Sequence, residues 1–303
     1  MPIERETIRP PSHPLSLALW NFSSQWFLIP QGTGIIPVLF HRLDYQFTGL
    51  MILAKIVWVY TITLLGICLI LYLLRTILYP KHVIHQLRTN LTETACLSCI
   101  SIAFTSILQL AVLEYGEKAG LEIYILWWIN TAMAIIACAA LPFIHLTLQS
   151  PEINSIPTSI LLPFIATLAS AACSGVVCRF SHVTPELQAP AIIVAYLQVG
   201  AGLTLATVFD VILILQYLNC THPTPETVCQ DMILCGPFGQ GSFALQVLGQ
   251  AVNTASVAAY DREKFLTVHA AGTIGFISLF LGLLVWGMGC FGGVLPSCVS
   301  CIR

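Results

Sequence analysis

The sequence predicts an all-α membrane protein, a polytopic bundle of helices, and three observations lead to this prediction. Of the 303 residues, 57% are apolar and only 9% are Asp, Glu, Lys or Arg, against about 25% in ordinary soluble domains. The apolar residues form continuous runs of about 20, which is the length of a helix that crosses a bilayer. Barrel strands would instead alternate over about ten residues. A net charge of −2 without any run of Lys or Arg argues against a nucleic-acid partner.

Eight stretches are long and apolar enough to be spans in a lipid bilayer. They are residues 24–41, 51–74, 95–113, 123–148, 157–178, 189–218, 236–258 and 265–290. Basic residues near the first spans set the orientation of such proteins. Arg5 and Arg9 precede the first span, and Arg75, Lys81 and Arg88 follow the second. This distribution favours a cytoplasmic N-terminus.

Helix-breaking residues gather in alternate spans. The first span holds Gly32 and Gly34 between two prolines, the fifth holds Pro163, and the seventh opens with Gly-Pro-Phe-Gly-Gln-Gly at 236–241. Proline leaves a carbonyl free and glycine admits a close neighbour. In lipid, freed backbone groups must face protein or a wet cavity. We therefore expect odd spans inside and even spans facing lipid, as helical hairpins around a central pore. Ordinary packing of small residues is the alternative.

The candidate pore-lining residues are the groups at these breaks. Neutral dipoles suit a conduction path, because an ion must bind weakly enough to leave again. Since no cluster of Arg or Lys lies inside the spans, we do not expect a tight, charge-clamped anion site. The candidates are Gly32, Thr33, Gly34, Pro163, Pro237, Gly239 and Gln240.

Three further side chains in the spans are candidates for function. Asp210 is the one deep carboxylate, and intramembrane acids are costly and often functional. It is a candidate for proton or ion coupling, with a structural pairing as the alternative. Phe104 and Phe164 are candidate apolar plugs, with a place in the core or against lipid as the alternative.

No pattern in the sequence predicts an enzyme, a metal site or a cofactor. Serine-hydrolase, zinc-protease and phosphate-loop motifs do not occur. The two C-x-x-C pairs, Cys96/Cys99 and Cys298/Cys301, lie in an apolar stretch and in the last six residues. A metal site usually needs four matched ligands, so we interpret these cysteines as small apolar residues. The eight histidines show no repeated spacing that would hold a haem.

Short motifs, in order along the chain, resemble those of one transporter family. Trp26-Phe27 followed by Gly32-Thr33-Gly34-Ile35 resembles the W-F-x(4)-G-T-G-I of the tellurite-resistance/dicarboxylate transporter family, which includes slow-type anion channels. Further matches are Arg75-x-x-x-Tyr79-Pro80, Leu161-Leu162-Pro163, the Gly-Pro-Phe-Gly-Gln-Gly of 236–241 and Trp286-Gly287-Met288-Gly289. The G-P-x-G-Q-G motif is similar to that of the fungal sulfite efflux branch. The resemblance implies five helical hairpins around a pore, transport of small anions across the plasma membrane, and a trimer. Sulfite is the expected anion, with C4-dicarboxylates such as malate as the alternative.

The chain also departs from this family pattern. No motif after residue 290 matches the family's last two spans, so no gate residue can be named. We therefore predict a cytoplasmic tail at 1–21, a transporter domain at 22–290 and a divergent end at 291–303. Gln31 stands where the family usually has Met, and Ser101 replaces a proline in the third span. A truncated relative that does not transport remains an alternative.

Overall fold

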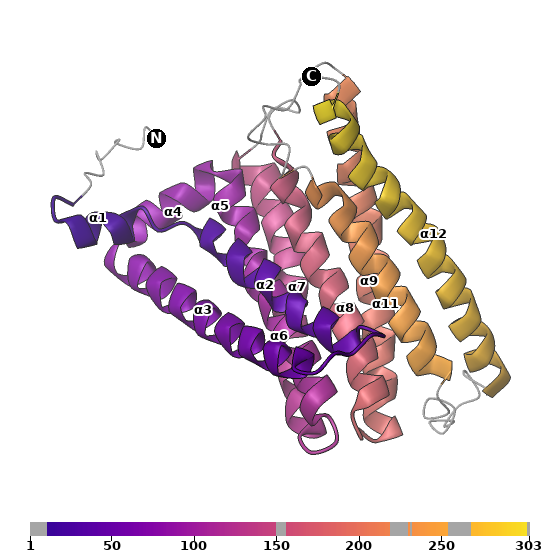
Figure 1. Ribbon diagram of the computed structural model, residues 1–303. Helices are drawn as coiled ribbons and strands as arrows, with labels where there is room; N and C mark the ends of the chain where they lie inside the picture. Colours follow the sequence, from indigo (N-terminus) through magenta and orange to yellow (C-terminus); the bar gives the residue numbers. More distant parts are fainter. Residues whose placement is uncertain (1–10, 150–155, 219–229, 231, 254–267, 302–303) are drawn as a thin grey trace.

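The computed structural model describes residues 11–149, 156–218, 230, 232–253 and 268–301. Over these ranges the protein is a bundle of helices without a strand, as Figure 1 shows. The prediction of an all-α, polytopic membrane bundle is confirmed.

Each of the eight predicted spans contains a long helix. These are α2 (Leu28–Arg42), α3 (Leu50–Leu78), α6 (Cys99–Tyr115), α7 (Gly120–Ile144), α8 (Leu162–Phe180), α9 (Pro185–Leu218), α11 (Gly236–Asn253) and α12 (Val268–Cys301). Six described helices are long and apolar enough to cross a membrane by themselves. The other two are α2, which has only 15 residues, and α11, which carries Gln240, Gln246 and Gln250. The last helix, α12, continues through most of the predicted divergent end.

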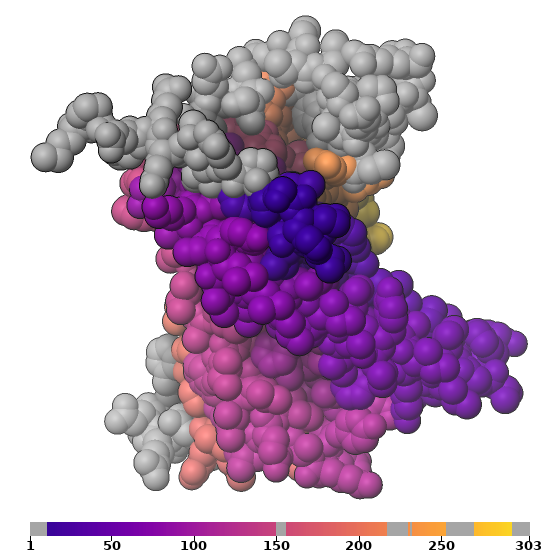
Figure 2. Space-filling view, turned by 90° about the vertical axis from the view of Figure 1, so that its left-hand side faces the viewer, coloured from indigo at the N-terminus to yellow at the C-terminus, as the bar shows by residue number. Residues whose placement is uncertain are grey.

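Burial alternates between odd and even spans. In α8, every residue of the most apolar stretch is buried inside the protein, and in α5–α6, Leu91–Tyr115, the share is 67%. The corresponding shares are only 17% in α3 and 22% in α12. Figure 2 shows the violet surface of the N-terminal helices α2 and α3 standing out from the body on one side. The predicted alternation therefore holds for α6 and α8 against α3, α7, α9 and α12. It does not hold fully for the first span, because only Pro30, Gly34, Pro37 and Val38 are buried in α2.

Small side chains allow α8 to lie at the centre of the bundle. It packs against α6, α7, α9 and α11. At Gly175, an added Cβ would come within 2.8 Å of the Val247 side chain on α11. This close approach of two helices is typical of membrane bundles, in which small residues let the backbones come together.

Buried hydrogen bonds fix the register of α6, α7 and α8. The Ser101 hydroxyl donates to the side-chain oxygen Oδ1 of Asn130 at 2.9 Å, and the side-chain nitrogen Nδ2 of Asn130 donates to the Thr105 hydroxyl at 2.6 Å. Trp127 donates from its indole nitrogen to the Ser170 carbonyl at 2.9 Å. Ser101 therefore joins two helices, and α6 runs without interruption from Cys99 to Tyr115.

A buried ion pair ties the start of α2 to the connection between α3 and α6. Arg75 near the end of α3 contacts Glu93 in α5 (Leu91–Ala95), with 2.5 Å between Nη1 and Oε1, and both side chains are 3% exposed. The other carboxylate oxygen accepts from the Ser23 hydroxyl at 2.6 Å and from the Ser24 backbone N–H at 3.1 Å. Arg75, the first residue of the R-x-x-x-Y-P motif, thus has a structural partner.

Part of the predicted N-terminal tail is a docked helix. In α1 (Pro14–Trp20), the Trp20 ring stacks on His82 of α4 (Pro80–Thr89), with 3.8 Å between ring centroids. Burial, and then the charge of Arg75, lower the pKa of His82 below its usual value. Both causes favour the neutral imidazole in this stack. α1 and α4 lie together at one end of the bundle (Figure 1).

Candidate functional site: a cavity between the odd spans

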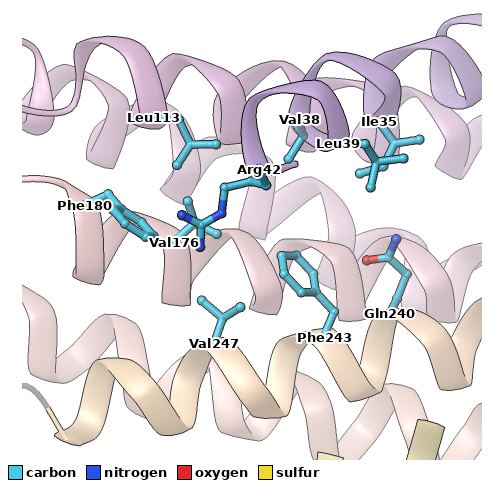
Figure 3. Close-up of a pocket in the computed structure, with 10 residues that line it drawn as sticks. All are labelled: Ile35, Val38, Leu39, Arg42, Leu113, Val176, Phe180, Gln240, Phe243 and Val247. Carbon is cyan, nitrogen blue, oxygen red and sulfur yellow. The ribbon is translucent and has the colours of Figure 1, made fainter. Parts of the chain in front are cut away.

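A cavity of about 280 Å³ lies between α2, α6, α8 and α11, which correspond to the first, third, fifth and seventh predicted spans. Figure 3 shows the side chains that project toward it from these four helices. Most of them are apolar, and only an arginine and a glutamine are polar. The lining residues are Ile35, Val38, Leu39, Arg42, Leu113, Val176, Phe180, Gln240, Phe243 and Val247.

The cavity is elongated along the helices. In Figure 3, Phe180 and Leu113 lie at one end, Ile35 and Gln240 lie at the other, and Arg42 reaches between them. Arg42 and Phe180 are the last residues of α2 and α8. We call the Phe180 end, where α2 and α8 end, the mouth of the cavity; it lies away from the end of the bundle that holds α1 and α4 (Figure 1).

The G-T-G motif in α2 serves packing more than lining. Gly34 is buried against α3 and α6, where an added Cβ would come within 3.0 Å of Ser106 Cβ. The Thr33 hydroxyl donates to the Ile29 carbonyl at 3.0 Å and accepts from Thr61 at 3.3 Å. Gly32 is exposed, and a Cβ there would meet no described atom within 4 Å. None of these residues is among those that line the described cavity.

The two glycines of this motif make a matched pair for a stability test. Gly34→Val is expected to lower the free energy of unfolding by about 1–3 kcal/mol, because the new methyl groups must displace Ser106 and Thr61. Gly32→Val should stay within about 0.5 kcal/mol of the wild type, because it enters open space. Thermal unfolding of the purified variants in detergent measures both. Equal unfolding temperatures for the two variants would contradict the packing role of Gly34.

Of the other candidate pore residues, one lines the cavity. Gln240 is half-buried and points into it from α11 (Figure 3). Its neighbour Gly239 is exposed, whereas Pro163 and Pro237 are buried in the first turns of α8 and α11. The break in the seventh span thus positions one polar lining group, and the prolines begin the helices.

Further amides continue the lining faces of α2 and α6. Gln109 lies one turn before Leu113 on α6, and Gln31 lies one turn before Ile35 on α2, so each shares a face with a lining residue. The side-chain carbonyl oxygens of both are buried without a hydrogen-bond partner among the described residues. Together with Gln240, these neutral dipoles give the interior polar groups that could contact a passing ion.

The predicted plugs lie in the core, and a different aromatic residue lines the cavity. Phe164 is fully buried and stacks on Phe209 with 5.3 Å between ring centroids, while Phe104 packs against both hydrophobic clusters. Phe243, which the sequence analysis missed, projects its ring into the cavity (Figure 3). Its spacing of three residues from Gln240 places both on one face of α11, and this was the available signal.

Asp210 is buried on α9, away from the cavity lining. Its side chain is 7% exposed, and Oδ1 has no hydrogen-bond partner in the described parts of the chain. The described ion pairs involve other residues. Buried acids are costly in a membrane and often functional. The role of Asp210 as a coupling residue stays a prediction.

Metal-ligating residues do not cluster where the structure is described. Within those ranges, no group of three or more His, Cys, Asp or Glu side chains could hold a metal ion. Cys96 and Cys99 are buried free thiols, as are most of the described cysteines. The side chains of Cys298 and Cys301 lie outside the described residues.

Comparison with known proteins identifies the family of the chain. A family described as voltage-dependent anion channel, SLAC1, matches residues 21–303. The chain belongs to the SLAC1 family. Sulfite efflux pumps SSU1 of Arthroderma benhamiae and Trichophyton rubrum are each 28% identical over 279 residues, covering 90% of this chain and 72% of the relative. A malic acid transport protein of Schizosaccharomyces pombe is 24% identical over 289 residues, covering 93% of this chain and 63% of the relative.

Membership of the SLAC1 family confirms the resemblance that the motifs indicated. The family and these relatives are channels or transporters, and no enzyme is among them. The chain is therefore a multi-pass membrane protein of an anion-transporting family. In such a protein, a cavity between the inward helices is the natural candidate for the transport path.

Proposed function

We propose that this SLAC1-family chain transports small anions, with sulfite as the first candidate, across the plasma membrane. One observation carries the proposal: the inward helices of four successive hairpins enclose a cavity whose lining combines an apolar wall, an amide and a single cation. The likeness to sulfite efflux pumps supports the choice of anion.

The chemistry of the cavity suits passage better than tight capture. An ion in a conduction path must be stabilised enough to enter and weakly enough to leave. Gln240 offers a neutral N–H donor, and Arg42 attracts negative charge near the mouth. Apolar side chains cover the rest of the wall, so the path holds few groups that would retain an anion.

Malate is the second candidate substrate. The likeness to a malic acid transport protein supports it, although at lower identity than that of the sulfite pumps. The Gly-Pro-Phe-Gly-Gln-Gly sequence that opens α11 favours sulfite, because it resembles the motif of the sulfite branch; it also supplies the lining residue Gln240.

Flux measurements in proteoliposomes test the proposal. Purified protein is reconstituted, and uptake of sulfite, malate, nitrate and chloride is compared with and without a proton gradient. We expect sulfite to move fastest. Transport-inactive protein that is monodisperse and well folded would contradict the proposal and favour a relative that does not transport.

Coupling to protons is proposed to depend on Asp210. If the carboxyl group carries the proton, Asp210→Asn abolishes the response of flux to a proton gradient while flux down an anion gradient continues.

We also propose a cytoplasmic N-terminus and a homo-oligomer, which is a trimer by family resemblance. Protease protection of an N-terminal tag and mass photometry measure these two properties.

Shortening the aromatic ring in the cavity is expected to raise flux. Phe243→Ala removes a ring that projects into the path, so the initial rate of sulfite uptake should rise by at least about twofold. Phe280→Ala is the matched control, since that ring on α12 is 70% exposed and is not among the lining residues. An unchanged or lower rate in well-folded Phe243→Ala would contradict the assignment of the path.

A further inference from the structure

Two arginines meet on one aromatic ring at the mouth of the cavity. Arg42, the last residue of α2, holds its guanidinium carbon 4.7 Å from the centroid of the Phe180 ring. Arg179, next to Phe180 at the end of α8, holds its own 4.9 Å from the same centroid. Both distances lie within the range of cation–π attraction. Two cations that are 137 positions apart in the sequence thus contact one ring.

Neither Arg42 nor Arg179 takes part in an ion pair among the described residues. The ion pairs in the described ranges join Arg75 to Glu93, and join Lys55 and His41 to Glu114. Glu114, at the end of the neighbouring helix α6, has one carboxylate oxygen 2.8 Å from Lys55 and the other 3.8 Å from His41. Two like charges near each other raise the local positive potential, which favours an anion between or beside them.

A structural explanation accounts for only part of this arrangement. Each arginine lies in the last turn of its helix, where a cation interacts favourably with the helix dipole. That effect explains why a basic residue ends each helix. It does not require both guanidinium groups to lie on one ring, nor Arg42 to line the cavity.

The geometry leaves hydrogen-bond donors available. A guanidinium that contacts a ring with its face keeps N–H donors along its edge, and these match two oxygens of one oxyanion. Figure 3 shows Arg42 extended into the cavity beside the Phe180 ring. An anion held there would be at the entrance of the path, in contact with solvent, because both arginines are exposed.

We propose that Arg42 and Arg179, held by Phe180, form a binding site for a small oxyanion at the mouth of the cavity. The proposal builds on the proposed transport function and assigns the step at which the anion enters or leaves the path. The ligand class is an anion with at least two oxygens on one centre, which includes sulfite and excludes chloride from bidentate binding. Solvent exposure makes the site weak and sensitive to salt.

Transport kinetics of charge-neutral variants test this site. Arg42→Gln, Arg179→Gln and the double variant are reconstituted, and initial sulfite uptake is measured over a range of concentrations at low and high salt. The KM for sulfite should rise about threefold to tenfold at low salt, as expected for loss of an exposed charge pair, with the maximal rate little changed. At high salt the difference should shrink.

Two controls separate binding from a general effect of charge. Arg88→Gln removes the same charge from an exposed position in α4, at the other end of the bundle, and should leave the KM unchanged. Arg42→Lys keeps the charge and loses the planar fork, so it should recover sulfite transport only in part while chloride transport recovers fully. An equal change of KM in Arg88→Gln would overturn the site.

A binding measurement keeps the site testable apart from transport. Sulfite should raise the unfolding temperature of the detergent-solubilised wild type, and the double variant should lose this increase. If the wild type transports sulfite and the variants match it in both KM and thermal response, the site is refuted while the proposed function stands. If the wild type does not transport but shows the thermal response that the double variant loses, the proposed function fails and the site stands.

Discussion

Replacing Glu93 with glutamine is expected to lower the free energy of unfolding by about 3–5 kcal/mol, because it leaves Arg75 as a buried charge without a partner. The same carboxylate accepts hydrogen bonds from Ser23 and Ser24, which precede α2. The change therefore loosens the start of α2 as well. Thermal or denaturant unfolding of the purified variant in detergent measures the loss.

Two further variants show whether the loss comes from an unpaired charge. Glu117→Gln removes a carboxylate that is exposed and should leave the unfolding temperature unchanged. The double variant Arg75→Met/Glu93→Leu removes both charges and should be more stable than Glu93→Gln alone. An unfolding temperature of Glu93→Gln equal to that of the wild type would show that this ion pair does not hold the two segments together.

Phe164→Ala is expected to destabilise the bundle by about 3–5 kcal/mol, the range observed when a buried phenylalanine leaves a cavity. The ring is fully buried and stacks on Phe209, so its removal opens space between α8 and α9. Phe164→Leu should cost less, because it fills most of the space. A thermal unfolding series over the three proteins measures the order.

The same variants test the earlier interpretation of Phe164 as a plug. A plug residue would raise anion flux on truncation and leave stability largely unchanged, which is the opposite of what we expect. Phe280→Ala is the control for loss of a ring that is 70% exposed, and it should change neither property. Increased sulfite flux through Phe164→Ala of wild-type stability would return this residue to the path.

The fold was largely predictable because membrane helices carry their signal locally. Each run of about 20 apolar residues reports one helix, and the helix break at Pro163 marked the fifth span as an inner one. α8 is the clearest example, since its composition of Ala, Ser and Gly lets it occupy the centre with every residue of its most apolar stretch buried. In contrast, α3 is rich in Leu and Ile, a composition that suits a helix with an exposed apolar surface.

The cavity was less predictable because it depends on contacts between distant segments. A glycine in the sequence indicates a close approach but not its partner. Gly34 packs against neighbouring helices, whereas the glycine-rich start of α11 places Gln240 in the cavity lining. Arg42 and Arg179 each resemble ordinary residues at the end of a helix. They come to one ring because α2 and α8 both pack against α6, and both arginines lie just outside the predicted spans 24–41 and 157–178.

The state of the cysteines has a consequence for a protein that handles sulfite. Sulfite is a sulfur nucleophile that splits a disulfide into an S-sulfonate and a thiolate, by the same type of attack as in thiol–disulfide exchange. A free thiol offers it no bond to split. The cysteine side chains that the structure describes are free thiols: Cys68, Cys96, Cys99, Cys138, Cys173, Cys178, Cys235 and Cys290. Packing and buried hydrogen bonds join the described helices. The described scaffold thus contains no covalent link that its proposed cargo would cleave.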